Sequence, residues 1–266
     1  MTKHNFIDTD IFIHKLNPDP KLNLAAKTVF ENNRPCAMSS FSLVELKGNY
    51  ISDLILLHRK IFDSESLEVA YAKITRTGGR KSALMFAMLI SWISNFSPHP
   101  WNEKKEELLS YLDGQISVAW ESFKKNVDEI YDDIKCSRST EAPEDDGEKW
   151  SATIPHCRKD NTKCIITSFI KQYNQELVSL INHVNNLDSH DRTQELLRIK
   201  NIAEISINNK FPWEGNTCRQ VADLLIGLQS KVGHKLISSN FREHSQLHIP
   251  LNYQFEHFNL VKERTQ

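Results

Sequence analysis

The chain has no long hydrophobic run. Its longest apolar stretch covers residues 83–90 and is followed directly by Ser91, whereas a helix that crosses a membrane needs roughly 20 apolar residues. The N-terminus also lacks the apolar segment and the small-residue cleavage site of a secretory signal. We therefore expect no membrane-spanning segment and a cytoplasmic protein.

Cysteine and net charge are scarce as well. The five cysteines are an odd and irregularly spaced set, which argues against a disulfide framework and agrees with a reducing compartment. A zinc site built from His156, Cys157, Cys164 and Cys136 is the one cysteine-based alternative, although it contains no C-x-x-C pair. The net charge of −1 neither requires nor excludes a nucleic-acid partner, because a binding groove needs only a local cationic patch.

Both ends of the chain alternate between strand-like and helix-like patterns. The N-terminal part reads as strand, helix, strand and helix, over residues 5–11, 21–31, 35–38 and from Ser39 onwards. The C-terminal part reads as a helix stopped by Gly233 and two strands, over residues 217–231, 235–238 and 254–259. This order predicts an α/β fold with one central, mainly parallel sheet to which both ends contribute.

The middle of the chain has a different composition. Residues 101–134 and 169–205 are charged and helix-periodic. They predict a mainly helical insertion over residues 75–211, which divides the α/β core into residues 1–74 and 212–266. Residues 137–149 have no hydrophobic period and contain several order-breaking residues, so we expect a mobile loop there.

Carboxylates follow the first predicted strand. Asp8 stands where a short apolar run ends, at the edge of an α/β sheet where ligands usually bind. Residues two apart on a strand face the same side, so Asp10 points with Asp8 if the strand continues through both. A loop or helix-capping aspartate is the other interpretation of Asp10.

Two further acids lie in helices that are expected to pack on the sheet. Ser42-x-x-Glu45 fits a capping box, but Glu45 is flanked by Val44 and Leu46, so we place it facing the crevice. Asp223 is expected in the second turn of a nearly apolar helix. A lone carboxylate there is costly unless it is paired or bound to a cation.

The segment after the next predicted strand adds more oxygen ligands. Residues 238–244, Ser-Ser-Asn-Phe-Arg-Glu-His, supply hydroxyl, amide and carboxylate groups. Oxygen-rich clusters suit hard cations such as Mg²⁺ or Mn²⁺. Together with phosphate oxygens, such a site typically serves phosphodiester hydrolysis.

Four motifs resemble, in order and context, those of the PIN-domain nucleases. They are Phe6-Ile7-Asp8-Thr9, Ser39-Ser40-Phe41-Ser42-Leu43-Val44-Glu45, Ala222-Asp223-Leu224-Leu225-Ile226 and Lys235-Leu236-Ile237-Ser238-Ser239-Asn240. The resemblance covers about the first 65 and the last 55 residues, and its specificity comes from four short motifs in the correct order. It implies a PIN-like three-layer fold and a metal-dependent nuclease that acts mostly on RNA.

The resemblance also assigns roles to single residues. Asp8, Glu45 and Asp223 fall on the metal-binding catalytic acids of the family, and Asn240 stands where the family often has aspartate. Asp10 and Glu243 are further candidate metal ligands. Many compact members are toxins that a cognate antitoxin inhibits, so the resemblance is compatible with an antitoxin-like partner. The sequence leaves a homo-oligomer open as well. The predicted insertion over residues 75–211 is far longer than the short helical segment found in compact members of the family.

Two groups of residues are candidates for holding the substrate. One surrounds Gly78-Gly79 and consists of Lys73, Arg76, Arg80 and Lys81, which suit phosphate oxygens if they are not simply a solvated loop. The other adjoins the acids and consists of Thr9, Ser238, Ser239 and Arg242.

Two other functions remain open from the sequence. Asp8-Thr9-Asp10 also resembles the D-x-D start of haloacid-dehalogenase-like phosphatases, in which an aspartate attacks phosphorus. Phe12 stands where that family has Thr or Val, and its later lysine and paired-aspartate motifs are not found here. The second alternative is a PIN-like scaffold that binds RNA or protein without cleaving it.

Overall fold

Five short parallel strands form the central sheet of the structure. The structure is a computed structural model, and it describes residues 3–17, 19–77, 79–96, 104–135, 144–145, 150–151, 165–208 and 221–259. The strands are β1 (Asn5–Ile7), β2 (Cys36–Ser39), β3 (Glu129–Tyr131), β6 (Leu236–Ser238) and β7 (Phe255–His257), in the order β3-β2-β1-β6-β7. Every neighbouring pair is parallel. The predicted α/β fold with a mainly parallel sheet is therefore confirmed.

The strand order reverses at β1. The chain leaves β1 toward β2 and β3, and later returns to add β6 and β7 on the opposite side of β1. In open α/β sheets, the carboxyl ends of the two strands at such a reversal border the usual ligand crevice. Here these ends are Asp8, after β1, and Ser239, after β6.

The sheet is covered on both faces. Phe6, Ala37 and Leu236 lie opposite one another in the register of the three central strands and share one core with the helices that follow. Ile7 and Ile237, the next pair along β1 and β6, are also fully or almost fully buried. Because neighbouring residues of a strand point to opposite faces, burial of both sets requires helices on both sides.

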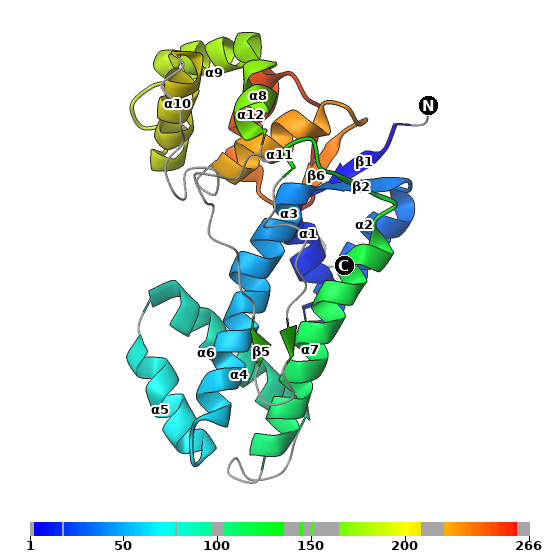
Figure 1. Ribbon diagram of the computed structural model, residues 1–266, viewed down its shortest axis with the longest axis vertical. Coiled ribbons are helices and arrows are strands. Elements are labelled where there is room, and N and C mark those ends of the chain that lie inside the picture. The colour runs from blue at the N-terminus through cyan, green and yellow to red at the C-terminus, as the bar shows by residue number, and fades with distance from the viewer. Residues whose placement is uncertain are drawn as a thin grey trace. The chain divides into compact units, whose positions relative to one another are not determined.

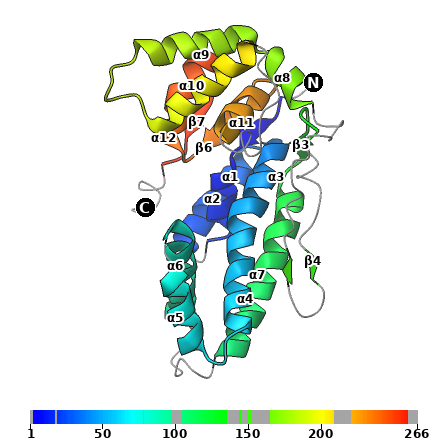
Figure 2. The same cartoon turned by 60° about the vertical axis from the view of Figure 1, so that its left-hand side comes forward.

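Strands β1, β2, β3, β6 and β7 belong to a compact unit formed by Met1–Glu45, Asn126–Thr140 and Pro155–Gln266. Its helices are α1 (Thr9–Lys15), α2 (Pro20–Asn32), α3 (Ser40–Glu45), α8 (Ile166–Lys171), α9 (Asn174–Asn186), α10 (Gln194–Ile207), α11 (Ala222–Ser230) and α12 (Phe241–Leu251) (Figure 1). Helices α9 and α10 pack as a pair, and α9 also packs against α12 (Figure 2).

Leu46–Lys125 and Glu141–Ile154 form the second compact unit. It contains the π-helical segment η1 (Leu46–Ile51), α4 (Ser52–Phe62), α5 (Leu67–Thr77), α6 (Gly79–Phe96), nearly all of α7 (Lys105–Asn126) and the antiparallel pair β4 (Glu144–Asp145) and β5 (Trp150–Ser151). His58 on α4 lies 3.0 Å from Asp113 on α7. No described helix has both the length and the apolar character that a membrane span requires.

The observed elements correct several expected boundaries. The first strand ends at Ile7 and not near residue 11, because α1 begins at Thr9. The helix expected through residue 134 ends at Asn126, and Glu129–Tyr131 instead pairs with β2 as an edge strand. The two compact units do not follow the expected divisions at 74/75 and 211/212. The loop expected over 137–149 lies outside the described residues except Glu144–Asp145, which form β4.

Gly233 offers a stability test of the turn before β6. A Cβ atom at this position would lie 2.6 Å from the backbone oxygen of His4 and 2.6 Å from Cδ2 of Phe6. The His4 oxygen cannot easily retreat, because it accepts a hydrogen bond from the backbone of His234 at 2.8 Å. We expect Gly233→Ala to lower the free energy of unfolding by about 1–3 kcal/mol, as overpacking usually does. Urea denaturation would measure it, and an unchanged midpoint would contradict the prediction.

Candidate metal centre

Asp8 lies at the carboxyl end of β1 and caps the N-terminus of α1. Its backbone is extended, and its Oδ1 accepts a hydrogen bond from the backbone N–H of Thr9 at 2.7 Å. Its Oδ2 accepts one from Ser238 Oγ at 2.7 Å and lies 3.2 Å from Nε2 of His244. The side chain is thereby fixed at the strand reversal, with only 4% of the residue exposed.

Asp10 reaches the same place from the first turn of α1. The strand does not continue through it, so the expected strand geometry is wrong, yet the helical turn brings its carboxylate back to β6. Its Oδ2 accepts hydrogen bonds from Ser238 Oγ at 3.2 Å, from the Ser239 N–H at 2.9 Å and from Ser239 Oγ. Its Oδ1 is buried and has no hydrogen-bond partner among the described residues.

Glu45 ends helix α3 and points to the start of α1. Its Oε2 accepts a hydrogen bond from Thr9 Oγ1 at 2.7 Å. The Ser42-x-x-Glu45 box, the alternative interpretation of this segment, does not cap α3, because Ser39 Oγ accepts the backbone N–H of Phe41 at 2.9 Å. Glu45 is therefore available to the acidic cluster.

Asp223 enters from helix α11, in its first turn rather than the expected second turn. The expected start of this helix, at Thr217, lies outside the described residues. Asp223 Oδ1 lies 3.7 Å from His244 Nε2, and its side chain is 22% exposed. One potential ligand atom from each of Asp8, Asp223 and His244 falls within 4.8 Å of the others.

The carboxylates of this cluster repel one another. Burial raises the pKa of Glu45 to about 8, with further contributions from the charges of Asp8 and Asp223. Burial and the charge of Asp8 raise the pKa of Asp10 to about 7. Among the described residues, burial and neighbouring acids therefore outweigh the positive charge near these two carboxylates.

Asp223 is affected in the same way. Burial raises its pKa to about 7, against the lowering effect of His244 and together with the charges of Asp8, Glu243 and Glu195. Glu195 lies in the first turn of α10, so the helix pair α9–α10 contributes negative potential to the site. The sequence offered no signal for this contribution, because Glu195 lies in an ordinary charged helical stretch.

His244 is the functional candidate that the sequence interpretation missed. It lies on α12, is fully buried, and its Nδ1 is 2.9 Å from the hydroxyl of Tyr253. Burial acts to lower the pKa of His244, but the hydrogen bond to Asp8 and the charges of Asp8 and Asp223 outweigh it and raise the pKa. Burial acts to raise the pKa of Asp8, but the hydrogen bond and charge of His244 outweigh it and lower the pKa. The sequence does contain a signal for His244: in a helix that begins after Asn240, His244 lies about one turn further along and on the side that faces the sheet.

The other predicted residues near β6 have mixed positions. Asn240 occupies the N-cap position of α12, but its side chain makes no capping hydrogen bond, and its backbone N–H donates to Ser238 Oγ at 2.9 Å. Glu243 is close enough to influence Asp223, whereas Arg242 is exposed. Ser238 and Ser239 orient Asp8 and Asp10 through the hydrogen bonds described above.

The predicted cationic loop is not a loop. Lys73 and Arg76 are exposed residues of α5 in the second unit, and Arg80 and Lys81 lie in the first turn of α6. Lys73 Nζ donates to the backbone oxygen of Asp63 at 3.2 Å. The glycines were expected to break the structure, but only Gly78 separates the two helices, and Gly78 lies outside the described residues. The zinc candidates Cys136, His156, Cys157 and Cys164 also lie outside them.

The donor set fits a divalent cation. Asp8, Asp223 and His244 bring two carboxylates and one imidazole nitrogen within 4.8 Å of one another. Asp10 and Glu45 lie near enough for their charges to act on the same acids, and Asp10 Oδ1 has no hydrogen-bond partner among the described residues. A divalent ion would offset both the burial and the mutual repulsion that raise the pKa values of Glu45, Asp10 and Asp223. In the described part of the chain, the other group of this kind, Asp188, His190 and Asp191, is exposed, where acidic clusters commonly occur without an ion.

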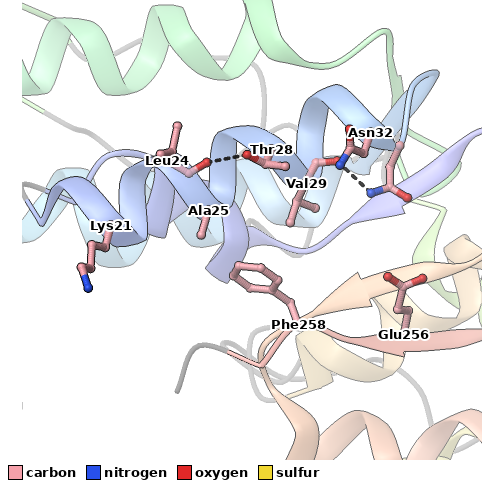
Figure 3. A pocket seen from close by; sticks show the side chains of 9 residues that line it. Lys21, Leu24, Ala25, Thr28, Val29, Asn32, Glu256 and Phe258 are labelled. Carbon is pink, nitrogen blue, oxygen red and sulfur yellow. Dashed lines mark hydrogen bonds between the residues drawn. The ribbon is translucent and has the colours of Figure 1, made fainter. Parts of the chain in front are cut away.

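A cavity of about 610 Å³ lies elsewhere on the same unit, between α2 and the end of β7 (Figure 3). It is lined by Lys21, Leu24, Ala25, Thr28, Val29, Asn32, Asn33, Glu256 and Phe258. None of the clustered acids lines it, so the candidate centre rests on side-chain geometry and not on this cavity.

Comparisons with known proteins add no relative. No protein-family model, no curated protein and no solved structure matches the chain. The function must therefore be argued from the site itself.

The raised pKa values predict how stability depends on pH. Without divalent ions, the folded protein holds protons on Asp10, Asp223 and Glu45 that the unfolded chain releases near pH 4. Stability should therefore fall as the pH rises from about 4 through 8. Loss of charge on His244, whose pKa is also raised, acts in the same direction. We expect the melting temperature in EDTA to be a few degrees lower at pH 8.5 than at pH 5.

Asp223→Asn is the control for this pH effect, because it removes one repelling charge. We expect the variant to show a smaller decrease in melting temperature between the same two pH values. Adding Mn²⁺ to the wild type at pH 8.5 should raise its melting temperature. Equal pH slopes for the two proteins would contradict the assigned repulsion.

Proposed function

We propose that the chain is a metal-dependent endonuclease that hydrolyses phosphodiester bonds, with RNA as its substrate. One observation carries the proposal: Asp8 and Asp10 at the start of α1, Glu45 of α3 and Asp223 of α11 gather at the strand reversal, and His244 is the buried imidazole that the described residues place beside them. Such an arrangement favours a divalent cation over a structural ion pair, because one imidazolium can offset only one of the four negative charges.

Asp8, Glu45 and Asp223 would hold the ion, and Asp10 is a further candidate ligand. Bound Mg²⁺ or Mn²⁺ supplies a more acidic water molecule and positive charge for the phosphate oxygens. Ser238 Oγ donates to Asp8 Oδ2 at 2.7 Å and also lies 3.2 Å from Asp10 Oδ2, so it holds the two carboxylates close together. Thr9 does the same for Glu45 through its hydroxyl. The exposed Arg242, two residues beyond the N-cap of α12, is the cation of this segment that we assign to the substrate phosphate.

The choice of RNA rests on the resemblance to PIN-domain nucleases. The four motifs that carry it lie on β1, α3, α11 and β6, and the acids they contain are those of the cluster. The resemblance also extends the proposal to a regulatory protein partner of the antitoxin type.

The phosphatase alternative is disfavoured by the surroundings of Asp8. An attacking aspartate needs a free carboxylate oxygen. Oδ1 of Asp8 accepts the Thr9 N–H, and Oδ2 accepts Ser238 Oγ and faces His244. This immobilisation suits a metal ligand better than a nucleophile.

The test is cleavage of end-labelled single-stranded RNA, transfer RNA and single-stranded DNA by the purified full chain. Each substrate is incubated with Mg²⁺, with Mn²⁺ and with EDTA. We expect RNA cutting with either ion and none with EDTA. Asp223→Asn should abolish cutting, whereas Asp188→Asn, which alters an exposed acid of the other group, should leave it unchanged.

Three outcomes would redirect the proposal. Preferential cutting of DNA would keep the nuclease but change its substrate. Binding of RNA without cutting, unaffected by Asp223→Asn, would favour the scaffold alternative. A trapped aspartyl-phosphate on Asp8 would favour the phosphatase.

A further inference from the structure

His244 completes the donor set of the candidate metal centre with a nitrogen atom. Its Nε2 lies 3.2 Å from Asp8 Oδ2 and 3.7 Å from Asp223 Oδ1. With bonds of about 2.1 Å, neighbouring ligand atoms of an octahedral ion lie roughly 3 Å apart and opposite ones about 4.2 Å apart. Both separations from Nε2 are ones that a single ion can bridge, and the ligand atoms of all three residues lie within 4.8 Å of one another.

The imidazole ring is held in the orientation that a ligand requires. Nδ1 lies 2.9 Å from the Tyr253 hydroxyl. The ring also packs edge-on against Tyr253 and beside Phe255, at centroid distances of 6.2 and 5.6 Å. A metal-binding histidine almost always donates its other ring N–H to a hydrogen-bond acceptor, which fixes the tautomer. With the Tyr253 hydroxyl as that acceptor, Nε2 would face the ion in place of its hydrogen bond to Asp8.

Tyr253 is itself positioned by the absence of a side chain at Gly227. A Cβ atom at Gly227 would lie 2.8 Å from Cε1 of Tyr253. The tyrosine ring therefore approaches α11 closely, one turn beyond Asp223. Gly227, Tyr253 and His244 form a continuous chain of contacts that ends at the carboxylates.

An ion pair between His244 and Asp8 leaves much of the cluster unexplained. It does not neutralise Glu45, and the 3.7 Å separation from Asp223 is long for a hydrogen bond. It also gives no partner to Asp10 Oδ1, which has none among the described residues. A cation between the three ligand atoms explains why Asp223 and His244 approach without a hydrogen bond, and its charge would also act on Asp10 and Glu45.

We propose that His244 is a direct metal ligand alongside Asp8 and Asp223, that Tyr253 is its positioning residue, and that the centre consequently prefers Mn²⁺ to Mg²⁺. The inference rests on the proposed metal-dependent function and specifies its ion. Mg²⁺ strongly prefers oxygen ligands, whereas imidazole suits transition-metal ions, so one nitrogen donor shifts selectivity toward Mn²⁺.

The test is pulsed electron paramagnetic resonance of Mn²⁺ bound to the full chain, without a His tag and in an amine-free buffer. We expect the echo to show coupling to a directly bound ¹⁴N nucleus. Labelling the wild type with ¹⁵N-histidine should replace it with ¹⁵N coupling, which requires no variant to fold. Mn²⁺ bound without nitrogen coupling would overturn the inference but leave the proposed function standing. Failure of the folded protein to bind any divalent ion would overturn both.

Three variants distinguish a ligand from a merely structural histidine. His244→Gln should abolish the nitrogen coupling, lower Mn²⁺ affinity about 10–100-fold and lower Mg²⁺ affinity less. Tyr253→Phe should keep the coupling but lower Mn²⁺ affinity about 10-fold. The matched control is His234→Gln, an exposed histidine before β6 and thus at the opposite end of that strand from Ser238, which should change neither. Coupling that persists in His244→Gln would overturn the assignment.

Discussion

Asp8→Asn is expected to lower the rate of metal-dependent RNA cleavage by at least about 10²–10³-fold, the scale on which removal of one group that stabilises transition-state charge is usually felt. The substitution removes the negative charge of the carboxylate that links Ser238, His244 and the start of α1. It leaves an amide of nearly the same shape. The measurement is the single-turnover cleavage rate at saturating Mn²⁺.

The loss should be chemical and not structural. Asp8 also caps α1 through its Oδ1, and asparagine is about as good an N-cap residue as aspartate. We therefore expect the circular dichroism spectrum of Asp8→Asn to match that of the wild type, whereas Asp8→Ala should in addition lose about 1 kcal/mol of stability from the missing cap. A folded Asp8→Asn protein that cuts RNA at the wild-type rate would remove Asp8 from the proposed mechanism.

Phe6→Ala should have the largest effect on stability. Phe6 occupies the central strand, has no exposed surface and packs against Tyr131 of β3, with ring centroids 5.0 Å apart and ring planes tilted by 37°. It also fills the space beside Gly233. Truncation of a buried phenylalanine typically costs about 3–5 kcal/mol, a large part of the roughly 5–15 kcal/mol that stabilises an ordinary domain. Urea denaturation of the sheet-containing unit would measure the loss.

Leu24→Ala is the matched control for Phe6→Ala. Leu24 is 65% exposed on α2, so its truncation should change the free energy of unfolding by less than about 0.5 kcal/mol. Similar losses for the two variants would mean that β1 is not the centre of the core.

The acids of the site could be predicted from the sequence because their neighbouring residues are unusual for acids. A carboxylate directly after a short apolar strand, as at Asp8, or within an apolar helix, as at Asp223, needs a compensating partner wherever the chain folds. The structure brings both together with Glu45. It does not bring Lys73 and Arg76 into a loop, because helix propensity around Gly78-Gly79 is sufficient to keep both flanks helical.

Strand β3 shows why other elements could not be predicted. Its residues, Glu129–Tyr131, are flanked by acids and contain no apolar run. The strand forms because the free edge of β2 offers hydrogen bonds to it, and Asp128 strengthens the junction by accepting the Cys36 N–H at 2.7 Å. A three-residue strand is too short to show hydrophobic periodicity, and the sequence does not reveal which distant segment it pairs with.

The sequence by itself determined that the chain is an α/β protein with a mainly parallel sheet, because strand burial and helix amphipathicity are local patterns. It also singled out Asp8, Glu45 and Asp223, since acids in apolar surroundings stand out in any fold. Only the tertiary structure decided that Asp10 returns to Ser238, that His244 faces the carboxylates and that Tyr253 holds its ring. The first two contacts join residues more than 200 positions apart, and the third joins His244 to a residue beyond the end of α12. Packing sets all three.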